Sequence, residues 1–261
     1  MKNFEYKKSL GQNFLIDQNI INKIINSIDL KEESLIIEIG PGSGALTREL
    51  VKLNANIISF EIDTRLRDEL DNLSNDNSNL EIIYQDFLKL NLKEFLKSRK
   101  YKNLYFVANL PYYITTAIIN KITEESDPNE MILMVQKEVA ERFSANPNTK
   151  DYSSISVFLQ YNYDISKVTL VSKNCFFPKP KVDSMVIKFK SIENRIRPDD
   201  EEKFYKLIKD AFKFKRKNLR NNLKEYNIDK INDILKKYDK DLTTRAESLT
   251  VKEFIDISNN L

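Results

Sequence analysis

The sequence predicts an α/β protein in which helices cover both faces of a parallel sheet, followed by a small all-helical domain. From residue 35 to residue 135, short apolar runs typical of buried strands alternate with segments of helical periodicity. A glycine-rich turn follows the first apolar run, as in sheets that bind nucleotides at their strand ends. Beyond Pro198, apolar residues recur only at helical spacings.

The individual elements follow from these periodicities. Asp17 precedes apolar residues spaced three and four apart, which predicts a capped amphipathic helix over 20–28. Runs rich in Ile, Val and aromatic residues predict strands at 35–37, 56–61, 80–84, 104–108, 131–135, 154–160, 164–171 and 184–189. The segments between the first five strands predict helices at 45–52, 66–70, 88–97 and 116–123, and a surface loop at 72–79.

The same patterns divide the chain into two domains, 1–192 and 193–261. The polar segment 191–200 contains Pro198 and indicates a linker. After it, helical spacings predict short helices around 204–212, 219–223 and 231–235. A sheet domain with a smaller helical appendage fits a chain of 261 residues.

Composition excludes several kinds of active site. The chain has no histidine and a single cysteine, Cys175. This rules out an internal disulfide, a cysteine-cluster zinc site and a Ser-His-Asp triad, and we expect no metal. No apolar run approaches the roughly 18 residues of a membrane span, and residues 1–8 carry no apolar signal core. We therefore expect a cytoplasmic protein without a membrane partner.

The glycines are few and clustered. At a usage of about 7%, a chain of this length would hold about 18 glycines. It has 4, and three of them are Gly40, Gly42 and Gly44. Glycine permits positive φ and the close approach of a ligand, so this strand-to-helix turn predicts a nucleotide-type binding loop. In the dinucleotide fingerprint the third glycine comes one residue later, so the loop alone does not identify the cofactor.

Acidic side chains end the next two predicted strands, at the sheet edge where ligands of open α/β sheets bind. Glu61 lies 21 positions after Gly40, which suits ribose hydroxyls, although alone it also fits a surface carboxylate. Asp86 is placed to accept from an adenine amino group, although alone it also fits a helix cap.

The most specific stretch is Asn-Leu-Pro-Tyr at 109–112, where the fourth strand ends. Pro111 fixes a turn, so the Asn109 side chain and a neighbouring carbonyl can aim at one point beside the ring of Tyr112. This suits a planar substrate with an exocyclic amine, because two acceptors for its N–H groups localise the lone pair on nitrogen. Attack on a sulfonium methyl then requires in-line placement rather than a base.

Positive charge is concentrated in one segment. The net charge is +3, but residues 179–220 contain 14 Lys and Arg against 7 Asp and Glu, a local +7. Such a segment is often only a solvated surface, and by itself it does not decide for nucleic acid. Near the end of this segment, phenylalanines alternate with basic residues. This pattern fits either a solvated helix face or a surface that contacts phosphate. These residues are Phe212, Lys213, Phe214, Lys215, Arg216, Lys217 and Arg220.

Together, five motifs resemble the small-subunit (16S) rRNA adenine N6,N6-dimethyltransferase family. They are GQNFL at 11–15, EIGPG at 38–42, NLPY at 109–112, VQKEVAER at 135–142 and FFPKPKVDS at 176–184. The resemblance runs from about residue 10 to residue 222. It implies a Rossmann-like S-adenosylmethionine methyltransferase sheet as the catalytic domain, 1–192, and a helical rRNA-binding domain, 193–261.

The resemblance also implies roles for individual residues. Contacts to the cofactor, S-adenosyl-L-methionine, are implied for Asn13, Leu15, Gly40, Gly42, Glu61, Asp86 and Asn109. The target amine and ring would be held by Asn109, Leu110, Pro111 and Tyr112, with Phe176 stacked on the base. Phe176 and Phe177 also fit ordinary core residues. RNA contacts are implied for Lys179, Lys181, Lys213, Lys215, Arg216, Lys217 and Arg220, with Lys7 and Lys8 as further candidates.

Position 113 departs from the family pattern, because this chain has Tyr113 where the family commonly has Asn. The position lies outside the amine-binding trio, so we expect altered packing rather than lost activity.

The function that the resemblance implies is dimethylation of two adjacent adenines in a 3′-terminal hairpin loop of 16S rRNA, during small-subunit biogenesis. The enzyme would act as a monomer on an immature 30S subunit. One alternative is the sister family that methylates an adenine of 23S rRNA and confers macrolide resistance, although Leu110 and residues 136–140 favour the small-subunit family. Another is a non-catalytic assembly factor that uses only the basic surface. A nicotinamide oxidoreductase would have no use for the stretch 109–112.

Overall fold

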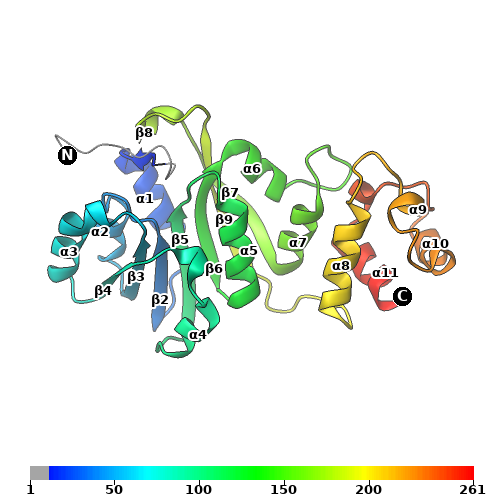
Figure 1. Cartoon of the computed structure of the whole chain (residues 1–261), viewed down its shortest axis with the longest axis horizontal. Helices are drawn as coiled ribbons and strands as arrows, with labels where there is room; N and C mark the ends of the chain where they lie inside the picture. Colours follow the sequence, from blue (N-terminus) through cyan, green and yellow to red (C-terminus); the bar gives the residue numbers. More distant parts are fainter. Residues whose placement is uncertain (1–11) are drawn as a thin grey trace. The chain divides into compact units, whose positions relative to one another are not determined.

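The computed structural model describes residues 12–261, and its largest element is a seven-stranded sheet of order β4-β3-β2-β5-β6-β9-β7 (Figure 1). Five strands run parallel: β2 (Ser34–Ile39), β3 (Ala55–Glu61), β4 (Leu80–Tyr84), β5 (Asn103–Asn109) and β6 (Glu130–Gln136). β9 (Ser184–Ser191) pairs antiparallel with β6, and β7 (Tyr163–Val171) is the edge strand. The strand order reverses at β2, which lies between β3 and β5. Ligands of open α/β sheets bind at such a reversal.

The central strands are apolar because both faces of the sheet are covered. All six residues of β2 are buried. Ile36 lies opposite Ile57 and Tyr105 on one face, and these pack with helix α1 (Gln18–Asn26) and helix α2 (Thr47–Leu50). On the other face, the Phe60 ring lies 5.4 Å from that of Phe95 in helix α4 (Leu92–Lys97). The predicted α/β sheet with helices on both faces is confirmed.

Local sequence signals account for most of the helices. Asp17 caps α1, since its carboxylate accepts from the N–H groups of Asn19 and Ile20. The remaining helices between the strands are α3 (Arg67–Asn75), α5 (Thr115–Glu125) and α6 (Lys137–Phe143). α3 extends to Asn75, so the first part of the loop predicted at 72–79 is helical.

The chain divides into two compact units and passes between them three times. The first contains residues up to 140 and residues 166–191, and the second contains residues 141–165 and 192–261. The last crossing is next to the predicted boundary at 192. Residues 141–165, which the prediction assigned to the first domain, belong with the C-terminal helices. Gly11, Lys7 and Lys8 of the predicted site lie outside the described residues.

The second unit is helical, with a core of its own. Its helices are α7 (Ser154–Asn162), α8 (Glu201–Ala211), α9 (Leu219–Asn222), α10 (Ile228–Lys236) and α11 (Val251–Asn259). Tyr161 of α7 packs against Phe204 of α8, with ring centroids 4.8 Å apart. The strand predicted at 154–160 is therefore wrong. The Ser153 N–H donates to Ser156 Oγ (3.0 Å), which is one half of a capping box and was the available signal for a helix start.

Within residues 12–261, no helix combines the length and the apolar character needed to cross a bilayer.

An ion-pair cluster joins the segment that follows α1 to β6 and β9. Lys188 Nζ lies 3.0 Å from Glu130 Oε1 and 2.9 Å from Asp29 Oδ2, and it donates to the carbonyl of Ser27 (2.8 Å). Glu130 is buried, and the Lys188 side chain is 13% exposed. The hydrogen bond from Lys188 lowers the pKa of Asp29 to about 2. Lys190 reaches the same carboxylates at 3.3 and 4.0 Å, but its side chain is 58% exposed.

We expect Lys188→Ala to lower the free energy of unfolding by about 3 kcal/mol, because it leaves the buried Glu130 carboxylate without its close cation. Lys190→Ala, the matched control, should cost less than about 1 kcal/mol, since exposed pairs contribute little. Urea denaturation of both variants measures the difference. Equal destabilisation by the two substitutions would contradict this account.

Candidate active site

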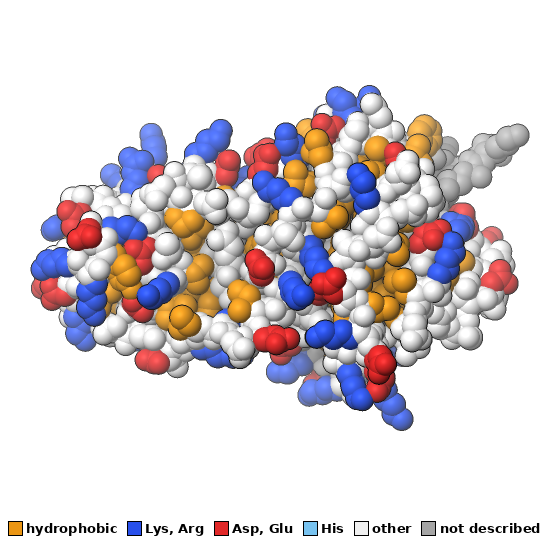
Figure 2. All heavy atoms as spheres, turned by 180° about the vertical axis from the view of Figure 1, so that it is seen from behind, with side chains coloured by type: hydrophobic (Ala, Val, Ile, Leu, Met, Phe, Trp, Pro, Cys, Tyr) orange, Lys and Arg blue, Asp and Glu red, His pale blue; other side chains and the backbone are white. Residues whose placement is uncertain are grey.

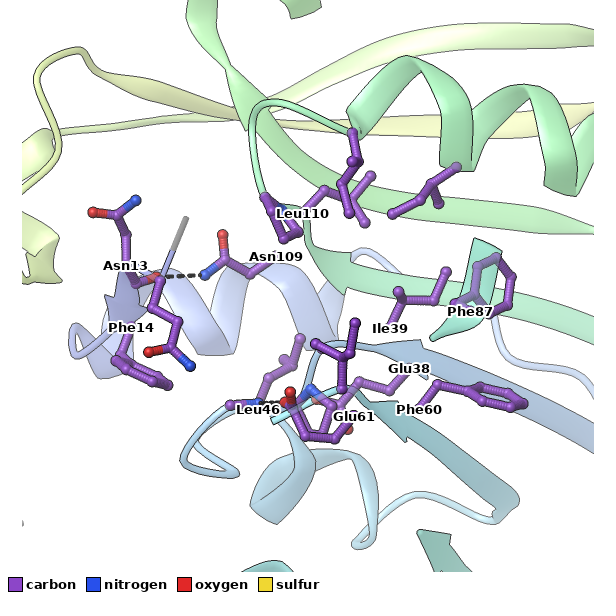
Figure 3. A pocket seen from close by; sticks show the side chains of 18 of the residues that line it. Asn13, Phe14, Glu38, Ile39, Leu46, Phe60, Glu61, Phe87, Asn109 and Leu110 are labelled. Atoms are coloured by element: carbon purple, nitrogen blue, oxygen red, sulfur yellow. Dashed lines mark hydrogen bonds between the residues drawn. The ribbon is translucent and has the colours of Figure 1, made fainter. Parts of the chain in front are cut away.

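A cavity of about 260 Å³ lies at the carboxyl ends of β2, β3, β4 and β5 (Figure 3). Every residue predicted to bind the cofactor lines it: Asn13, Leu15, Gly40, Gly42, Glu61, Asp86 and Asn109. Leu110, Pro111 and Tyr112 of the predicted catalytic set line it as well. The glycine turn after β2 and the turn after β5 thus face one cavity. A chemical group can pass from one ligand to another only if the two are bound close together, and this arrangement meets that condition.

Two glycines of the turn differ in the space beside their Cα atoms. Gly40 has φ +70°, and a Cβ there would meet nothing within 4 Å. Gly42 has φ +57°, and a Cβ there would lie 2.7 Å from Cε1 of Phe14. Gly40 therefore leaves room for a ligand against the backbone, whereas Gly42 makes room for the Phe14 ring.

Glu61 joins the end of β3 to the glycine turn. Its Oε2 accepts from the N–H of Gly42 (3.0 Å), and its Oε1 accepts from the N–H of Asp63 (2.8 Å). The side chain is buried, and burial raises the pKa of Glu61. Two backbone donors thus fix this carboxylate at the cavity wall, and the reading of Glu61 as a surface carboxylate is wrong.

Glu38 is a second buried carboxylate of the cavity, and the sequence reasoning gave it no role. Its Oε2 accepts from Thr47 Oγ1 (2.8 Å) and Ser59 Oγ (2.7 Å). Burial raises the pKa of Glu38 to about 7, and the negative charge of Glu61 adds to the effect. The signal available in the sequence for such a residue was a carboxylate inside the apolar run 35–39, because Glu is almost never fully buried unless it has partners.

The two carboxylates give the cavity an unbalanced charge. Among the described residues that line it, none is Lys or Arg. A buried carboxylate without a cation is unfavourable, and an opposite charge placed nearby relieves the cost. The cavity is therefore complementary to a ligand that carries positive charge.

The predicted cap at Asp86 is confirmed, whereas its contact with an adenine amino group stays a prediction. Its Oδ1 accepts from the Leu88 N–H (3.0 Å) and caps the 3-10 turn Phe87–Lys89, and the residue lines the cavity.

Hydrogen bonds orient the stretch that follows β5. Asn109 Nδ2 donates to the carbonyl of Asn13 (2.9 Å; Figure 3), which leaves Oδ1 as an acceptor. The Leu110 N–H donates to the Met134 carbonyl (3.1 Å), while no donor among residues 12–261 is bonded to the Leu110 carbonyl. The Tyr112 hydroxyl shares a hydrogen bond with Ser184 Oγ (2.7 Å), and burial raises the pKa of Tyr112. Two acceptors thus stand beside a ring of fixed orientation.

Phe176 is the one residue of the predicted catalytic set that does not line the cavity. It pairs with Leu15 in a short ladder between β1 (Phe14–Leu15) and β8 (Phe176–Phe177). Its side chain is only 3% exposed and packs in the core with α1. A stacking role for Phe176 therefore requires its ring to leave the core.

Tyr113 is an aromatic residue of the cavity that the sequence reasoning set aside. It lines the cavity and is 63% exposed. The exposed ring is not packed in the interior, and the expected effect of this departure from the family pattern stays a prediction.

The predicted RNA contacts lie in two segments of the chain, one in each unit. Lys179 and Lys181 are exposed in the loop after β8. The others are exposed in the loop between α8 and α9, except Arg220, which is in α9 itself; they are Lys213, Lys215, Arg216 and Lys217. They do not form one helix face. On the side drawn in Figure 2, Lys and Arg side chains are interspersed with those of Asp and Glu.

Known proteins resemble this chain over nearly its whole length. A model of the family described as "Ribosomal RNA adenine dimethylase" matches residues 3–261. The "Ribosomal RNA small subunit methyltransferase A" of Clostridioides difficile (strain 630) is 42% identical over 264 residues, which cover 98% of this chain and 91% of the relative. The protein of the same name from Clostridium botulinum (strain Okra / Type B1) is 40% identical over 260 residues, covering 98% and 94%.

Two solved structures share the fold. A dimethyladenosine transferase from Plasmodium falciparum superposes with a TM-score of 0.78 at 27% identity, over 93% of this chain and 95% of that one. The 23S rRNA methyltransferase ErmE superposes with a TM-score of 0.76 at 25% identity, over 95% and 99%. Since sequence and fold agree along nearly the entire length, the chain belongs to the ribosomal RNA adenine dimethylase family.

Proposed function

We propose that this protein transfers methyl groups from S-adenosylmethionine to the N6 amines of two adjacent adenines in a 3′-terminal hairpin loop of 16S rRNA. Membership of the family gives the reaction, adenine dimethylation of ribosomal RNA. The small-subunit target is supported by relatives of that name at about 40% identity, whereas the 23S enzyme ErmE is 25% identical. The observation that carries the proposal is the single cavity lined by both the glycine turn and the stretch 109–112.

The residues of the cavity fit S-adenosylmethionine. When bound, this cofactor supplies an activated methyl group on a positively charged sulfonium. Glu38 and Glu61 are buried carboxylates whose ionised form a cationic ligand would favour, and no described lining residue supplies positive charge, which matches that ligand. Gly40 leaves open space against the backbone, and the Glu61 and Asp86 carboxylates suit ribose hydroxyls and an adenine amino group.

The target adenine would be held by the turn after β5. Asn109 Oδ1 and the Leu110 carbonyl can each accept one N6–H, which draws the amine nitrogen out of conjugation with the ring. The Tyr112 ring, fixed by Ser184, offers a face for the base. Catalysis then depends on orientation, because no titratable base is needed before transfer. The adenine must be unstacked to reach such a pocket.

We further propose an immature 30S subunit as the substrate and a monomeric enzyme. The exposed lysines of the loop after β8 and of the loop before α9 support contact with a large RNA surface.

We expect Asn109→Ala to lower kcat on undermethylated 30S particles by about 100-fold or more, because the amine loses one of its two acceptors and its placement. Affinity for S-adenosylmethionine should stay within about tenfold, since Glu38 and Glu61 remain. Primer extension across the 3′ hairpin of 16S rRNA measures methylation, and calorimetry measures cofactor binding.

Three results would overturn parts of this assignment. Unchanged dimethylation by Asn109→Ala would remove the proposed role of that side chain. Methylation of 50S but not 30S particles would favour the 23S enzyme. Binding to 30S particles without any cofactor binding would favour a non-catalytic assembly factor.

Cofactor affinity should depend on pH through Glu38. Its pKa of about 7 in the free protein means that the side chain is largely protonated below pH 7. A cationic ligand favours the ionised form, so binding lowers this pKa and releases a proton below pH 7. We expect affinity to rise about tenfold from pH 6 to pH 8. Calorimetry in buffers of different ionisation enthalpy detects the released proton, and Glu38→Gln should abolish both effects. A flat pH profile for the unmodified chain would refute this.

Tyr113 should contribute to substrate affinity. If its exposed ring stacks on a base, Tyr113→Ala should raise KM for 30S particles roughly fivefold, equivalent to about 1 kcal/mol of stacking. Tyr113→Phe should behave like the unmodified chain, and cofactor affinity should not change in either variant. Steady-state kinetics with purified particles tests this, and an unaltered KM in Tyr113→Ala would exclude the contact.

A further inference from the structure

We propose that the helical unit holds a second binding site, which takes one unpaired nucleotide of the RNA substrate. The site is a cavity of about 130 Å³ beside the loop between α8 and α9. Its walls include Tyr152, Phe212, Phe214, Lys215, Lys217 and Glu247, all within the second unit. The inference rests on the proposed function, because it assumes that the partner is RNA.

The loop that forms one wall is fixed around a single side chain. Asn222 Nδ2 lies within hydrogen-bond distance of the carbonyls of Ala211 (2.6 Å), Phe214 (3.3 Å) and Lys217 (3.4 Å). Its Oδ1 accepts from the N–H of Phe214 (3.2 Å). A loop held in this way does not have to be ordered when a ligand binds, which favours affinity.

Aromatic rings shape the cavity for a flat ligand. Tyr152 and Phe212 are packed edge to face, with centroids 6.2 Å apart at 63°. Phe214 is 56% exposed, although its backbone is fixed by Asn222. A rigid loop that keeps a phenyl ring in water next to a cavity offers a surface on which a base can stack.

The charges around the cavity favour a phosphate at one position and a base at another. Lys213, Lys215, Arg216 and Lys217 are exposed, and none of them forms an ion pair with any residue of 12–261. Lys215 Nζ instead donates to the carbonyl of Lys150 (3.1 Å). This local excess of cations attracts phosphate.

Glu247 determines which part of the nucleotide enters. The residue lines the cavity, and its carboxylate lies 3.8 Å from Arg245, too far for a close pair. It disfavours a phosphate inside the cavity, but it can accept a hydrogen bond from the exocyclic amine of a base. We therefore place the phosphate on the lysines at the rim and an amine-bearing base against Phe214.

The test uses the full chain and 30S particles that lack the methylation. Phe214→Ala should weaken binding to the particle about tenfold, and Phe214→Tyr should not, because stacking needs only a ring. Ile196→Ala is the matched control, since Ile196 is also apolar, 66% exposed and in the same unit. Thermal unfolding of Phe214→Ala should be unchanged, since the ring is outside the core.

Two further measurements distinguish the base from the phosphate. The double variant Lys215→Gln, Lys217→Gln should reduce the slope of log affinity against log salt by about 2, whereas Phe214→Ala should leave the slope unchanged. Ultraviolet crosslinking of the complex, followed by mass spectrometry, should find a nucleotide on the peptide that contains Phe214.

The outcomes separate this inference from the proposed function. If the unmodified chain methylates 30S particles and Phe214→Ala binds them equally well, the nucleotide site is wrong and the enzyme assignment stands. If the unmodified chain neither binds nor methylates the particles, both fail. A crosslink from this peptide to a ribosomal protein instead of rRNA would also overturn the site.

Discussion

The parallel pairing of β2 with β3 and β5 is the constraint on which the site depends. It aligns Ile39 with Phe60 and Ala108, so that the three strands end together. Glu61, the glycine turn and Asn109 follow directly, and none of them needs a long loop to reach the cavity. A shift of one residue in either pairing would turn the side chains of that strand to the opposite face and separate them.

Hydrogen bonds inside the protein then set the chemistry of these residues. Asn109 donates to Asn13, which decides that its oxygen, rather than its nitrogen, is available to a substrate amine. Backbone donors hold Glu61, and two hydroxyls hold Glu38. The site therefore combines rigid acceptors with buried negative charge, which suits a cationic methyl donor and an amine acceptor without a catalytic histidine.

The two units carry different parts of the proposed function. The sheet unit contains the cavity for the cofactor and the target adenine, while the helical unit contains the basic loop and the cavity beside Phe214. Residues 141–165 give the helical unit α7, whose Tyr161 packs on Phe204. The helical unit thus has a core of its own.

Strand periodicity and strand-end residues are local signals, so the amino-acid sequence alone predicts the sheet, the glycine turn, the stretch 109–112 and seven cofactor contacts whose residues all line one cavity. Other features depend on tertiary packing. Residues 154–160 are apolar enough for a strand, and packing against α8 makes them helical. Tertiary packing buried Glu38 and so raised its pKa, placed Phe176 in the core and left Tyr113 exposed, since these properties depend on neighbours that are distant in the chain.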